Sequence, residues 1–307
     1  MDLAARRPAR RTVTRARRLG PAALGAVAAV ALAACSAPLP EAPTPAESFD
    51  TAPERADGPP GPDNTGVPAG TVLEPSDSLR IEEDGAVVEG LDVDGCVVVD
   101  ADDVTIRNTR ITCTDAPGGR AVVMDGKHTG LVIEDVEIDG GGRTEIGIDL
   151  TDAVIRRVDV HHVNDGIRMG ANLVIEDSWI HTMTRQGDLH PDAIQGISAK
   201  NVVIRGNTLD PRNTRTGDLG NAAIMLGSET GTKTSEDVVI EGNHLDGGNY
   251  TINISSSITA EGFVVRDNVF GPNARYGPVL TRTDVPVGDG NVMRETEEPI
   301  DVDTRDD

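Results

Sequence analysis

The sequence predicts an all-β solenoid, in which short strands wind into coils that stack on one another. Three observations support this fold class. A short pattern of β-branched residues returns along most of the chain, and the residue after the centre of each copy alternates in charge. Aromatic residues make up only 2% of the 307 residues. A thin core built from layers of Val and Ile needs few aromatic side chains, so composition and repeat agree.

A clear copy of the repeated pattern is Lys-Asn-Val-Val-Ile-Arg-Gly-Asn-Thr-Leu-Asp at residues 200–210. The central apolar residues of the copies lie 18 to 36 residues apart: Val88, Ile106, Ile133, Ile155, Ile175, Ile204, Ile240 and Val265. This spacing is close to that of solenoid repeats. A β-branched run, a bend and a second apolar position do not follow a helical period, so each copy predicts two short strands at a corner.

Two further apolar positions complete each coil. One lies five residues after the central position: Val93, Ile111, Ile138, Val160, Ile180, Leu209, Leu245 and Phe270. The other marks a third strand: Val122, Ile148, Ile167, Ile194, Ile224, Ile252 and Val279. We therefore expect equivalent residues of successive coils to stack about 4.8 Å apart.

The residue after each central apolar position alternates in sign along the chain. In order these residues are Glu89, Arg107, Glu134, Arg156, Glu176, Arg205, Glu241 and Arg266. Stacked coils would place each charge between two opposite ones. Because an exposed ion pair contributes only about 0–1 kcal/mol, this ladder would fix the register of the coils more than it stabilises them.

The form Val-x-Ile-x-x-Asn-x-Leu, at 202–209 and 238–245, resembles the repeat of the right-handed parallel β-helix (pectate-lyase-like) family. The resemblance covers about residues 66–293 and implies a single-stranded right-handed parallel β-helix solenoid of about eight coils. It also implies an asparagine ladder of Asn207, Asn243 and Asn268 at one corner. The best-known members of the family act on polysaccharides, so a polysaccharide is the expected partner, although a fold alone assigns no reaction.

Residues 1–34 are predicted to be a lipoprotein signal peptide rather than part of the fold. Seven Arg precede an apolar run from Ala22 to Ala34, which is too short for a comfortable membrane span. The run ends Leu-Ala-Ala-Cys at residues 32–35, which resembles the lipobox of bacterial (actinobacterial-type) lipoproteins. This resemblance implies lipidation of Cys35 and an anchor at the outer face of the cell membrane.

The remaining chain divides into three predicted parts. Residues 35–65 are rich in Pro, Ala and acidic residues and predict a tether, followed by the β-helix at 66–296 and an acidic tail at 297–307. The formal net charge is −23, and removal of residues 1–34, with seven Arg and one Asp, would bring it to −29. Nucleic acid is excluded as a partner, because phosphate binding requires basic patches. An acidic glycan would be repelled unless a cation bridged it, and we expect a monomer.

Cys96 and Cys113 fall within one residue of each other on neighbouring coils if Val88 stacks on Ile106. This separation suits a disulfide, and an exported protein meets an oxidising environment. We therefore expect a disulfide near the N-terminal end of the solenoid, with two buried free thiols as the alternative.

Ionisable residues gather in the middle coils. The outward position after the second apolar residue is His161 in one coil and His181 in the next, with Asp139 and Asp210 on either side. Stacked imidazoles cannot both become charged cheaply, whereas flanking carboxylates favour a proton, so the pair suits general acid–base chemistry. Trp179 lies near His181 and could stack on a sugar ring or pack against protein.

Two loops thirty residues apart share the sequence Thr-Arg-x-Gly-Asp-Leu and predict the walls of a cleft beside the third strand. The first loop continues with His-Pro-Asp at 190–192, whereas the second has Gly-Asn-Ala at 220–222. In the β-helix family the substrate cleft lies beside this strand. The candidate catalytic residues are His161, His181, His190, Asp192, Asp165 and Arg185, and the candidate substrate-binding residues are Arg168, Asp188, Gln195 and Trp179.

Two mechanisms remain open for this cleft, with a polysaccharide lyase favoured over a glycoside hydrolase. In a lyase, a histidine or Arg185 would remove the proton next to a uronate carboxylate. Arg168, or a Ca²⁺ ion held by Asp188 and Asp192, would neutralise that carboxylate. In a hydrolase, Asp165, Asp188 and Asp192 would act as acid and base. The alternative class is a non-catalytic glycan-binding or structural surface protein.

Overall fold

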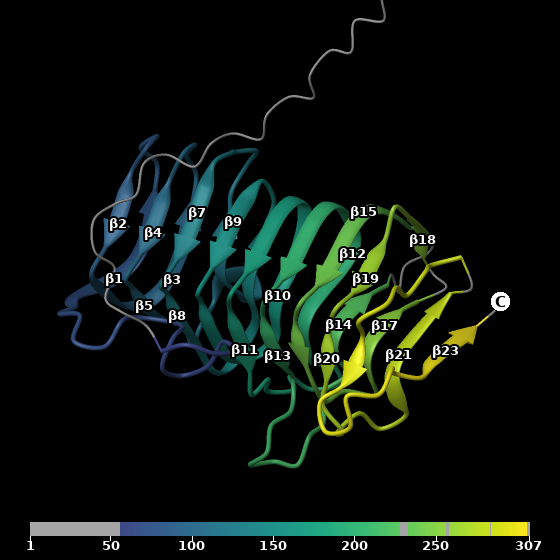
Figure 1. The fold of residues 1–307 in the computed structure, drawn as a ribbon. Helices are drawn as coiled ribbons and strands as arrows, with labels where there is room; N and C mark the ends of the chain where they lie inside the picture. Colours follow the sequence, from purple (N-terminus) through teal and green to yellow (C-terminus); the bar gives the residue numbers. More distant parts are fainter. Residues whose placement is uncertain (1–55, 228–232, 256–257, 283, 306–307) are drawn as a thin grey trace, which may run out of the picture. The chain divides into compact units, whose positions relative to one another are not determined.

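The computed structural model describes residues 56–227, 233–255, 258–282 and 284–305, which form a parallel β-helix. Successive coils follow one another from β1–β3 in purple and blue to β21–β23 in yellow (Figure 1). Residues 1–55 lie outside the described residues, and with them the predicted signal peptide, Cys35 and most of the predicted tether. In the ranges that are described, no helix has the length and apolar character needed to cross a membrane.

The first ladder of parallel strands carries the predicted central apolar residues. It contains β2 (Val87–Glu89), β4 (Thr105–Arg107), β7 (Leu131–Glu134), β9 (Ala153–Arg156), the ends of β10 (Asp159–Glu176) and β12 (Asp192–Arg205), β15 (Lys233–Glu241), β18 (Ile258–Glu261) and β19 (Val264–Arg266). The predicted register is confirmed from Val88 on Ile106 to Ile240 on Val265. From Ile106 onward these side chains are completely buried or nearly so, because successive strand residues point to opposite faces.

The second ladder carries the apolar residues five positions later. It contains the first parts of β1 (Glu74–Ile81), β3 (Leu91–Val99), β8 (Glu137–Leu150) and β10, together with β5 (Arg110–Thr112), β11 (Trp179–His181), β13 (Thr208–Asp210), β16 (His244–Leu245), β20 (Val269–Phe270) and β22 (Val292–Met293). Its register is also as predicted, and it stacks His161 directly on His181.

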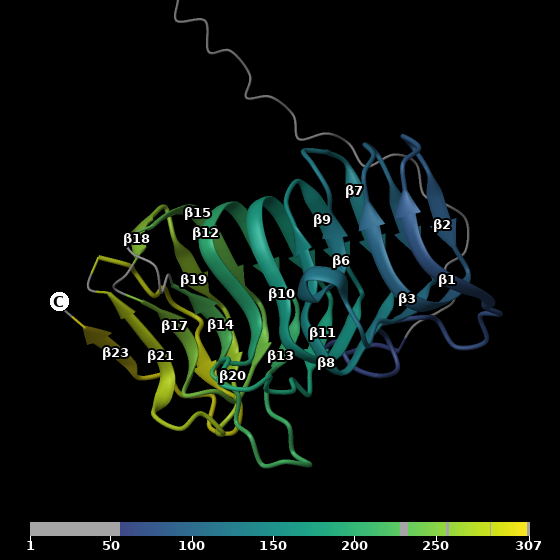
Figure 2. The same cartoon turned by 180° about the vertical axis from the view of Figure 1, so that it is seen from behind.

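The third ladder forms the face on which the cleft was expected. It contains the ends of β1, β3 and β8, the middle of β10, the start of β12, β6 (Arg120–Met124), β14 (Ala222–Leu226), β17 (Tyr250–Ile254), β21 (Gly277–Arg282) and β23 (Val302–Arg305). A short 3-10 helix, η1 (Pro117–Gly119), precedes β6, and both can be followed from behind in Figure 2. The predicted stack from Val122 to Val279 is confirmed.

The corners carry the predicted charge and asparagine ladders. In the charge ladder, four arginines each reach back to the glutamate of the preceding coil, over 2.5–2.8 Å: Arg107 to Glu89, Arg156 to Glu134, Arg205 to Glu176 and Arg266 to Glu241. In the asparagine ladder, the side-chain amide of Asn207 donates to Asn243, and that of Asn243 donates to Asn268. Asn291, which the sequence pattern did not include, continues this ladder beyond Asn268.

The disulfide is confirmed, and described residues of the predicted tail and of the predicted tether contact the β-helix. Cys96 and Cys113 are bonded, with their Cα atoms 5.0 Å apart. The predicted acidic tail contributes β23, whose residues pair with β21 in parallel. Five of the last ten residues of the predicted tether lie against the β-helix. A groove beside Arg157 and His244 is lined by Ala56, Gly58, Pro59, Pro60 and Asn64, and the backbone nitrogen of Gly66 donates to the carbonyl oxygen of Arg157 over 2.9 Å.

Candidate functional site

The predicted site residues fall into two groups of contacting side chains, because β10 turns a corner at His162. The residues before this corner belong to the second ladder, and those from Val163 to Met169 belong to the third. The first group, which we call the histidine cluster, consists of Asp139, His161, His162, Trp179 and His181, with the carboxylates beside them. The second group lines a pocket over the third ladder, and we call it the carboxylate pocket.

The carboxylate pocket has a volume of about 290 Å³. Its lining residues are Glu145, Asn164, Asp165, Arg168, Asp188, Leu189, His190, Gln195, Ile197 and Gly227. Five of the ten predicted site residues are among them. The pocket therefore lies where the sequence predicted a cleft, between the third ladder and the loop at 184–191.

Arg168 and Gln195 lie side by side on the third ladder, at paired outward positions of β10 and β12. The Nε of Arg168 donates to the amide oxygen of Gln195 over 3.2 Å, and its Nη2 donates to Asp165 over 3.2 Å. These two bonds fix the guanidinium in the pocket while 24% of its side chain stays exposed. A guanidinium held in this way can receive a carboxylate from a ligand.

Asp165 is buried beside this arginine, with only 3% of the residue exposed. Its Oδ1 accepts hydrogen bonds from the Asn164 side chain and from the backbone nitrogen of Asp192, over 2.9 and 3.3 Å. Burial raises the pKa of Asp165 to about 6, although the positive charge of Arg168 acts in the opposite direction. Asp165 therefore holds its proton to a higher pH than an ordinary aspartate does.

Asp192 is completely buried and does not line the pocket. Its carboxylate accepts hydrogen bonds from Asn221, over 2.9 Å, and from Gln195, over 3.5 Å. Burial, and then the charge of Asp165, raise the pKa of Asp192 well above its usual value. The prediction that Asp192 acts on a substrate directly is thus wrong for this structure, because its side chain is completely buried and does not face the pocket. Its place is beneath the pocket, holding Gln195.

The prediction that Arg185 could act as the base is also wrong for this structure. Its guanidinium donates two hydrogen bonds to Asp218, over 2.8 and 3.1 Å, and one to the carbonyl oxygen of Leu189 over 2.7 Å. The hydrogen bonds to Asp218 raise the pKa of Arg185, so it keeps its proton. Arg185 instead joins the two similar loops to each other.

Asn164 fixes the loop that carries His190 over the pocket. Its side-chain nitrogen donates to the carbonyl oxygen of His190 over 3.3 Å, and its oxygen accepts from the backbone nitrogen of Gln186 over 3.0 Å. His190 and Asp188 are both exposed at the pocket. Sequence reasoning missed Asn164, Asn221 and Glu145, although Asn164 stands next to the predicted Asp165 and Asn221 lies in the Gly-Asn-Ala segment that replaces His-Pro-Asp in the second loop.

The predicted stacking of His161 on His181 is confirmed, but the predicted carboxylate partner of His181 is wrong. The rings of His161 and His181 have centroids 5.3 Å apart. Asp139 lies 3.6 Å from Nδ1 of His161, as expected. The partner of His181 is Asp159, 3.0 Å from Nε2. It is not Asp210, whose carboxylate accepts two hydrogen bonds from the guanidinium of Arg212.

Trp179 stacks on a protein side chain. Its ring lies parallel to that of His181, with centroids 3.5 Å apart and an angle of 13°. Of the two alternatives for Trp179, packing against protein therefore describes this face of the indole.

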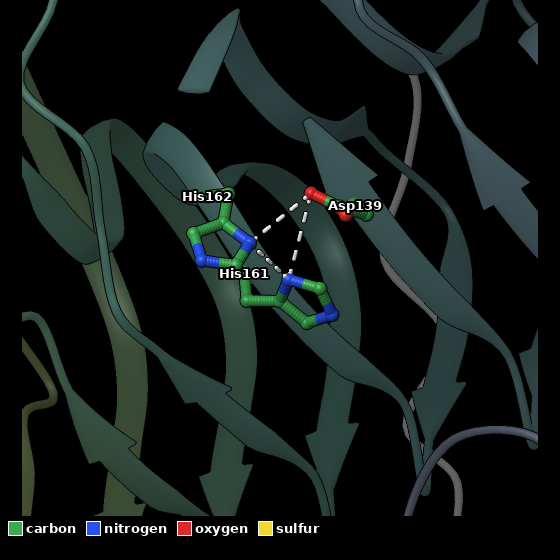
Figure 3. Close-up of side chains that lie close together, drawn as sticks. All are labelled: Asp139, His161 and His162. Atoms are coloured by element: carbon green, nitrogen blue, oxygen red, sulfur yellow. Dashed lines mark hydrogen bonds and ion pairs between the residues drawn. The ribbon is translucent and has the colours of Figure 1, made fainter. Parts of the chain in front are cut away.

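His162 is the residue of the cluster that sequence reasoning left out. Its Nδ1 lies 2.8 Å from Nδ1 of His161 and 3.2 Å from Oδ1 of Asp139. Figure 3 marks these contacts with dashed lines. Burial, and then the nearby His161, lower the pKa of His162. For His161 burial acts to lower the pKa, but the hydrogen bond with Glu137 and the charges of Asp159 and Asp139 outweigh it and raise the pKa.

One group of side chains in the described ranges has the spacing of metal ligands. Asp139, His161 and His162 offer three ligand atoms that all lie within 4.8 Å of one another, and no other three or more His, Cys, Asp and Glu there do so. The predicted Ca²⁺ ligands Asp188 and Asp192 do not form such a group, since Asp188 is exposed and Asp192 is completely buried.

The fold and the pocket define a parallel β-helix protein with a polar cleft on its third ladder. The chain belongs to the right-handed β-helix family, because the family model described as "Right handed beta helix region" matches residues 120–291. This range contains every residue of the carboxylate pocket and of the histidine cluster. Comparison with curated protein sequences found no match.

Two solved structures are similar to the chain at low identity. The A-module of mannuronan C-5 epimerase AlgE4 from Azotobacter vinelandii is 16% identical, over 73% of this chain and 64% of that one, with a TM-score of 0.29. The tailspike protein gp49 of the Acinetobacter baumannii bacteriophage Fri1, a capsular polysaccharide depolymerase, is 10% identical, over 77% and 65%, with a TM-score of 0.28. The chain thus spans less than two thirds of either structure, and a likeness at such identity concerns the fold alone.

Proposed function

We propose that the protein cleaves a uronate-containing polysaccharide by β-elimination, with the carboxylate pocket as its active site. The observation that carries this proposal is the fixed guanidinium of Arg168, which is held by Asp165 and Gln195 and lies in a pocket that His190 also lines. β-Elimination needs a cation that neutralises the uronate carboxylate and a base beside it. The pocket offers one group of each kind.

Hydrolysis by two carboxyl groups fits this geometry less well. Such hydrolysis requires two carboxyl groups that both face the scissile bond. Asp192 is completely buried, and both oxygens of Asp165 are occupied by hydrogen bonds from protein groups. We therefore assign these two carboxyl groups to holding Arg168 and Gln195 rather than to proton transfer with a sugar.

The proposed reaction begins when Arg168 pairs with the uronate carboxylate and makes the neighbouring C–H bond more acidic. His190 removes that proton as general base. The electron pair forms a C=C bond while the C–O bond to the leaving sugar breaks, and the leaving oxygen takes a proton from water. Each cleavage produces one unsaturated end and one saturated end.

The test is to incubate the purified protein with a panel of uronate and neutral polysaccharides. The ultraviolet absorbance of the new conjugated double bond and the number of reducing ends are followed together. We expect both signals to rise on a uronate polymer. His190→Ala should lower the rate about 10²–10⁴-fold, which is the usual contribution of a general base. His128→Ala is the matched control, because His128 contacts Asp100 in another part of the chain.

Two outcomes would contradict the proposal. Reducing ends without the ultraviolet signal would mean hydrolysis, and Asp188 and Glu145 would then be the carboxyl groups to test. Binding to a glycan without any turnover, unchanged by His190→Ala, would favour the alternative of a glycan-binding or structural surface protein.

We also propose that the protein is anchored to the outer face of the cell membrane through lipid on Cys35. Support comes from the basic stretch, apolar run and Leu-Ala-Ala-Cys sequence at residues 6–35. A Cys35→Ser variant expressed in its own cell type should lose incorporation of labelled fatty acid and leave the membrane fraction. A labelled, membrane-bound Cys35→Ser variant would contradict this location.

A further inference from the structure

The histidine cluster contains three ligand atoms that converge on one point. They are Nδ1 of His161, Nδ1 of His162 and Oδ1 of Asp139. All three point toward one another from neighbouring coils, since Asp139 and His161 are paired residues of β8 and β10 (Figure 3). The proposed lyase chemistry uses none of them.

The distances among these atoms fit a metal ion. The nitrogens are 2.8 Å apart, and Oδ1 of Asp139 lies 3.2 Å from His162 and 3.6 Å from His161. A triangle with these sides has a circumradius of about 1.9 Å, so a point about 0.9 Å out of its plane lies about 2.1 Å from all three atoms. That is the usual length of a bond from Zn²⁺ to a histidine nitrogen or a carboxylate oxygen.

We propose that Asp139, His161 and His162 bind one divalent transition-metal ion of the Zn²⁺ class. Two imidazole nitrogens and one carboxylate oxygen suit such borderline ions, whereas Ca²⁺ and Mg²⁺ prefer oxygen ligands alone. The inference goes beyond the proposed lyase function and does not depend on it.

The surroundings of the three ligands support a cation. Glu137 lies 3.5 Å from Nε2 of His161, where a carboxylate can hold the second ring nitrogen of a metal-bound histidine. The side chains of Asp139 and His162 are 32% and 30% exposed. An ion bound there would be reachable from solvent, and positions for water or a ligand would remain open beside the three protein atoms.

One contact opposes the ion. Nη2 of Arg215 lies 3.4 Å from Nε2 of His162. A guanidinium repels a nearby cation, and as a donor it favours the tautomer of His162 that carries its proton on Nδ1. Metal binding requires the exposed side chain of Arg215 to move away from His162. Arg215→Ala is therefore expected to tighten metal binding.

The backbone of His162 also calls for an explanation. Its φ is 52°, and the equivalent corner of the next coil, at Thr182, has the same φ of 52°. The corner thus demands a positive φ in both coils, and a side chain is tolerated there at some cost in strain. A metal-ligating role accounts for a histidine at this corner in one coil.

The experiment is isothermal titration calorimetry of Zn²⁺ into the purified protein after treatment with chelator, in parallel with Ca²⁺. We expect one Zn²⁺ per chain and no comparable heat with Ca²⁺. His162→Gly removes a ligand while suiting the positive φ, and it should weaken Zn²⁺ binding more than about 100-fold, beyond the loss typical of partners outside the coordination shell. Thr182→Gly is the matched control and should leave the affinity unchanged.

Two further variants make the test sharper. Glu137→Gln should weaken binding about 10-fold, whereas Arg215→Ala should strengthen it. The proposal is overturned if no stoichiometric Zn²⁺ binding occurs, in which case the short distance between the two nitrogens is a hydrogen bond between the two imidazoles. It is equally overturned if His162→Gly binds Zn²⁺ as well as the unaltered protein does. Thermal unfolding of each variant checks that the fold is intact.

Discussion

The unaltered protein should lose stability as the pH rises from about 4 to 6, because Asp165 gives up its proton. Asp165→Asn should not show this loss. The pKa of Asp165 is raised from 3.8 to about 6 by burial. Because the folded state holds this proton more tightly than the unfolded chain, the stabilising contribution is complete below about pH 4. It is lost as the pH rises through the folded pKa. Asparagine has no carboxyl proton, so the variant lacks this contribution to the pH dependence.

The size of the effect follows from the shift. Each pKa unit corresponds to about 1.4 kcal/mol, so a rise from 3.8 to about 6 changes the free energy of unfolding by about 3 kcal/mol. Asp192 adds to this in the same direction, since the charge of Asp165 helps to raise its pKa. Relative to the unaltered protein, Asp165→Asn should therefore gain about 3 kcal/mol or more between pH 4 and pH 7.

The assay is equilibrium urea unfolding of both proteins at pH 4 and pH 7. At each pH we take the difference between the free energies of unfolding of the two proteins, and we then compare this difference at pH 4 and at pH 7. A single value would also contain the effects of the lost bond to Arg168 and of the other carboxylates. Asp188→Asn is the control, since Asp188 is exposed on the loop over the same pocket. If Asp165→Asn and the unaltered protein respond equally to pH, Asp165 is not a carboxyl group with a raised pKa, and our electrostatic description of the pocket fails.

Three further predictions concern the solenoid and its substrate. Reduction of the Cys96–Cys113 disulfide, which closes a loop of 17 residues, should lower the free energy of unfolding by about 3 kcal/mol, measured by urea unfolding with and without reductant. Asn243→Ala should cost about 2–6 kcal/mol, because its Oδ1 accepts hydrogen bonds from the buried backbone and side-chain N–H groups of Asn207 and its side-chain nitrogen donates to the carbonyl of Ile204. Asn253→Ala, at an outward strand position, should cost little in the same assay. If the substrate is a polyuronate, kcat/KM should rise with moderate salt, because a chain of net charge −23 repels it and salt screens that repulsion. A rate that falls with salt from the lowest concentration would contradict the last prediction.

The strand register could be predicted from the sequence because a β-solenoid leaves little choice. A slip of one residue turns every inward side chain outward, so Ile106, Ile133 and their equivalents can stack in one way only. The alternating charges gave a second, independent measure of the same register. The ends of the fold were harder to predict, because β23 and the segment before Gly66 have no repeat pattern and are placed by contacts with distant coils.

The candidate site was predicted in its location but not in its internal contacts. Asp192 lies two residues before the inward Ile194, and this spacing already indicates a buried side chain. Arg185 was misjudged because its partner, Asp218, belongs to a loop 33 residues later, and no sequence rule pairs the two. His162 was left out because the alternation of strand residues ends at a corner, where a positive φ sets the direction of the side chain.

The carboxylate pocket and the histidine cluster share one property. Each has ionisable residues at positions where a neighbouring coil has a residue that does not ionise. Asp165 is paired with Ile146 in the coil before, and Asp192 is paired with Ala222 in the coil after. The fold can therefore fill this inward position with an apolar residue, and two buried carboxyl groups there cost stability at neutral pH. Stability does not explain these two carboxyl groups. Their contacts with Gln195 and with the partly exposed guanidinium of Arg168 are what the proposed binding site requires. The same reasoning applies at the corner with a positive φ. One coil has Thr182 at this corner, whereas the coil before it has His162, which faces His161 and Asp139.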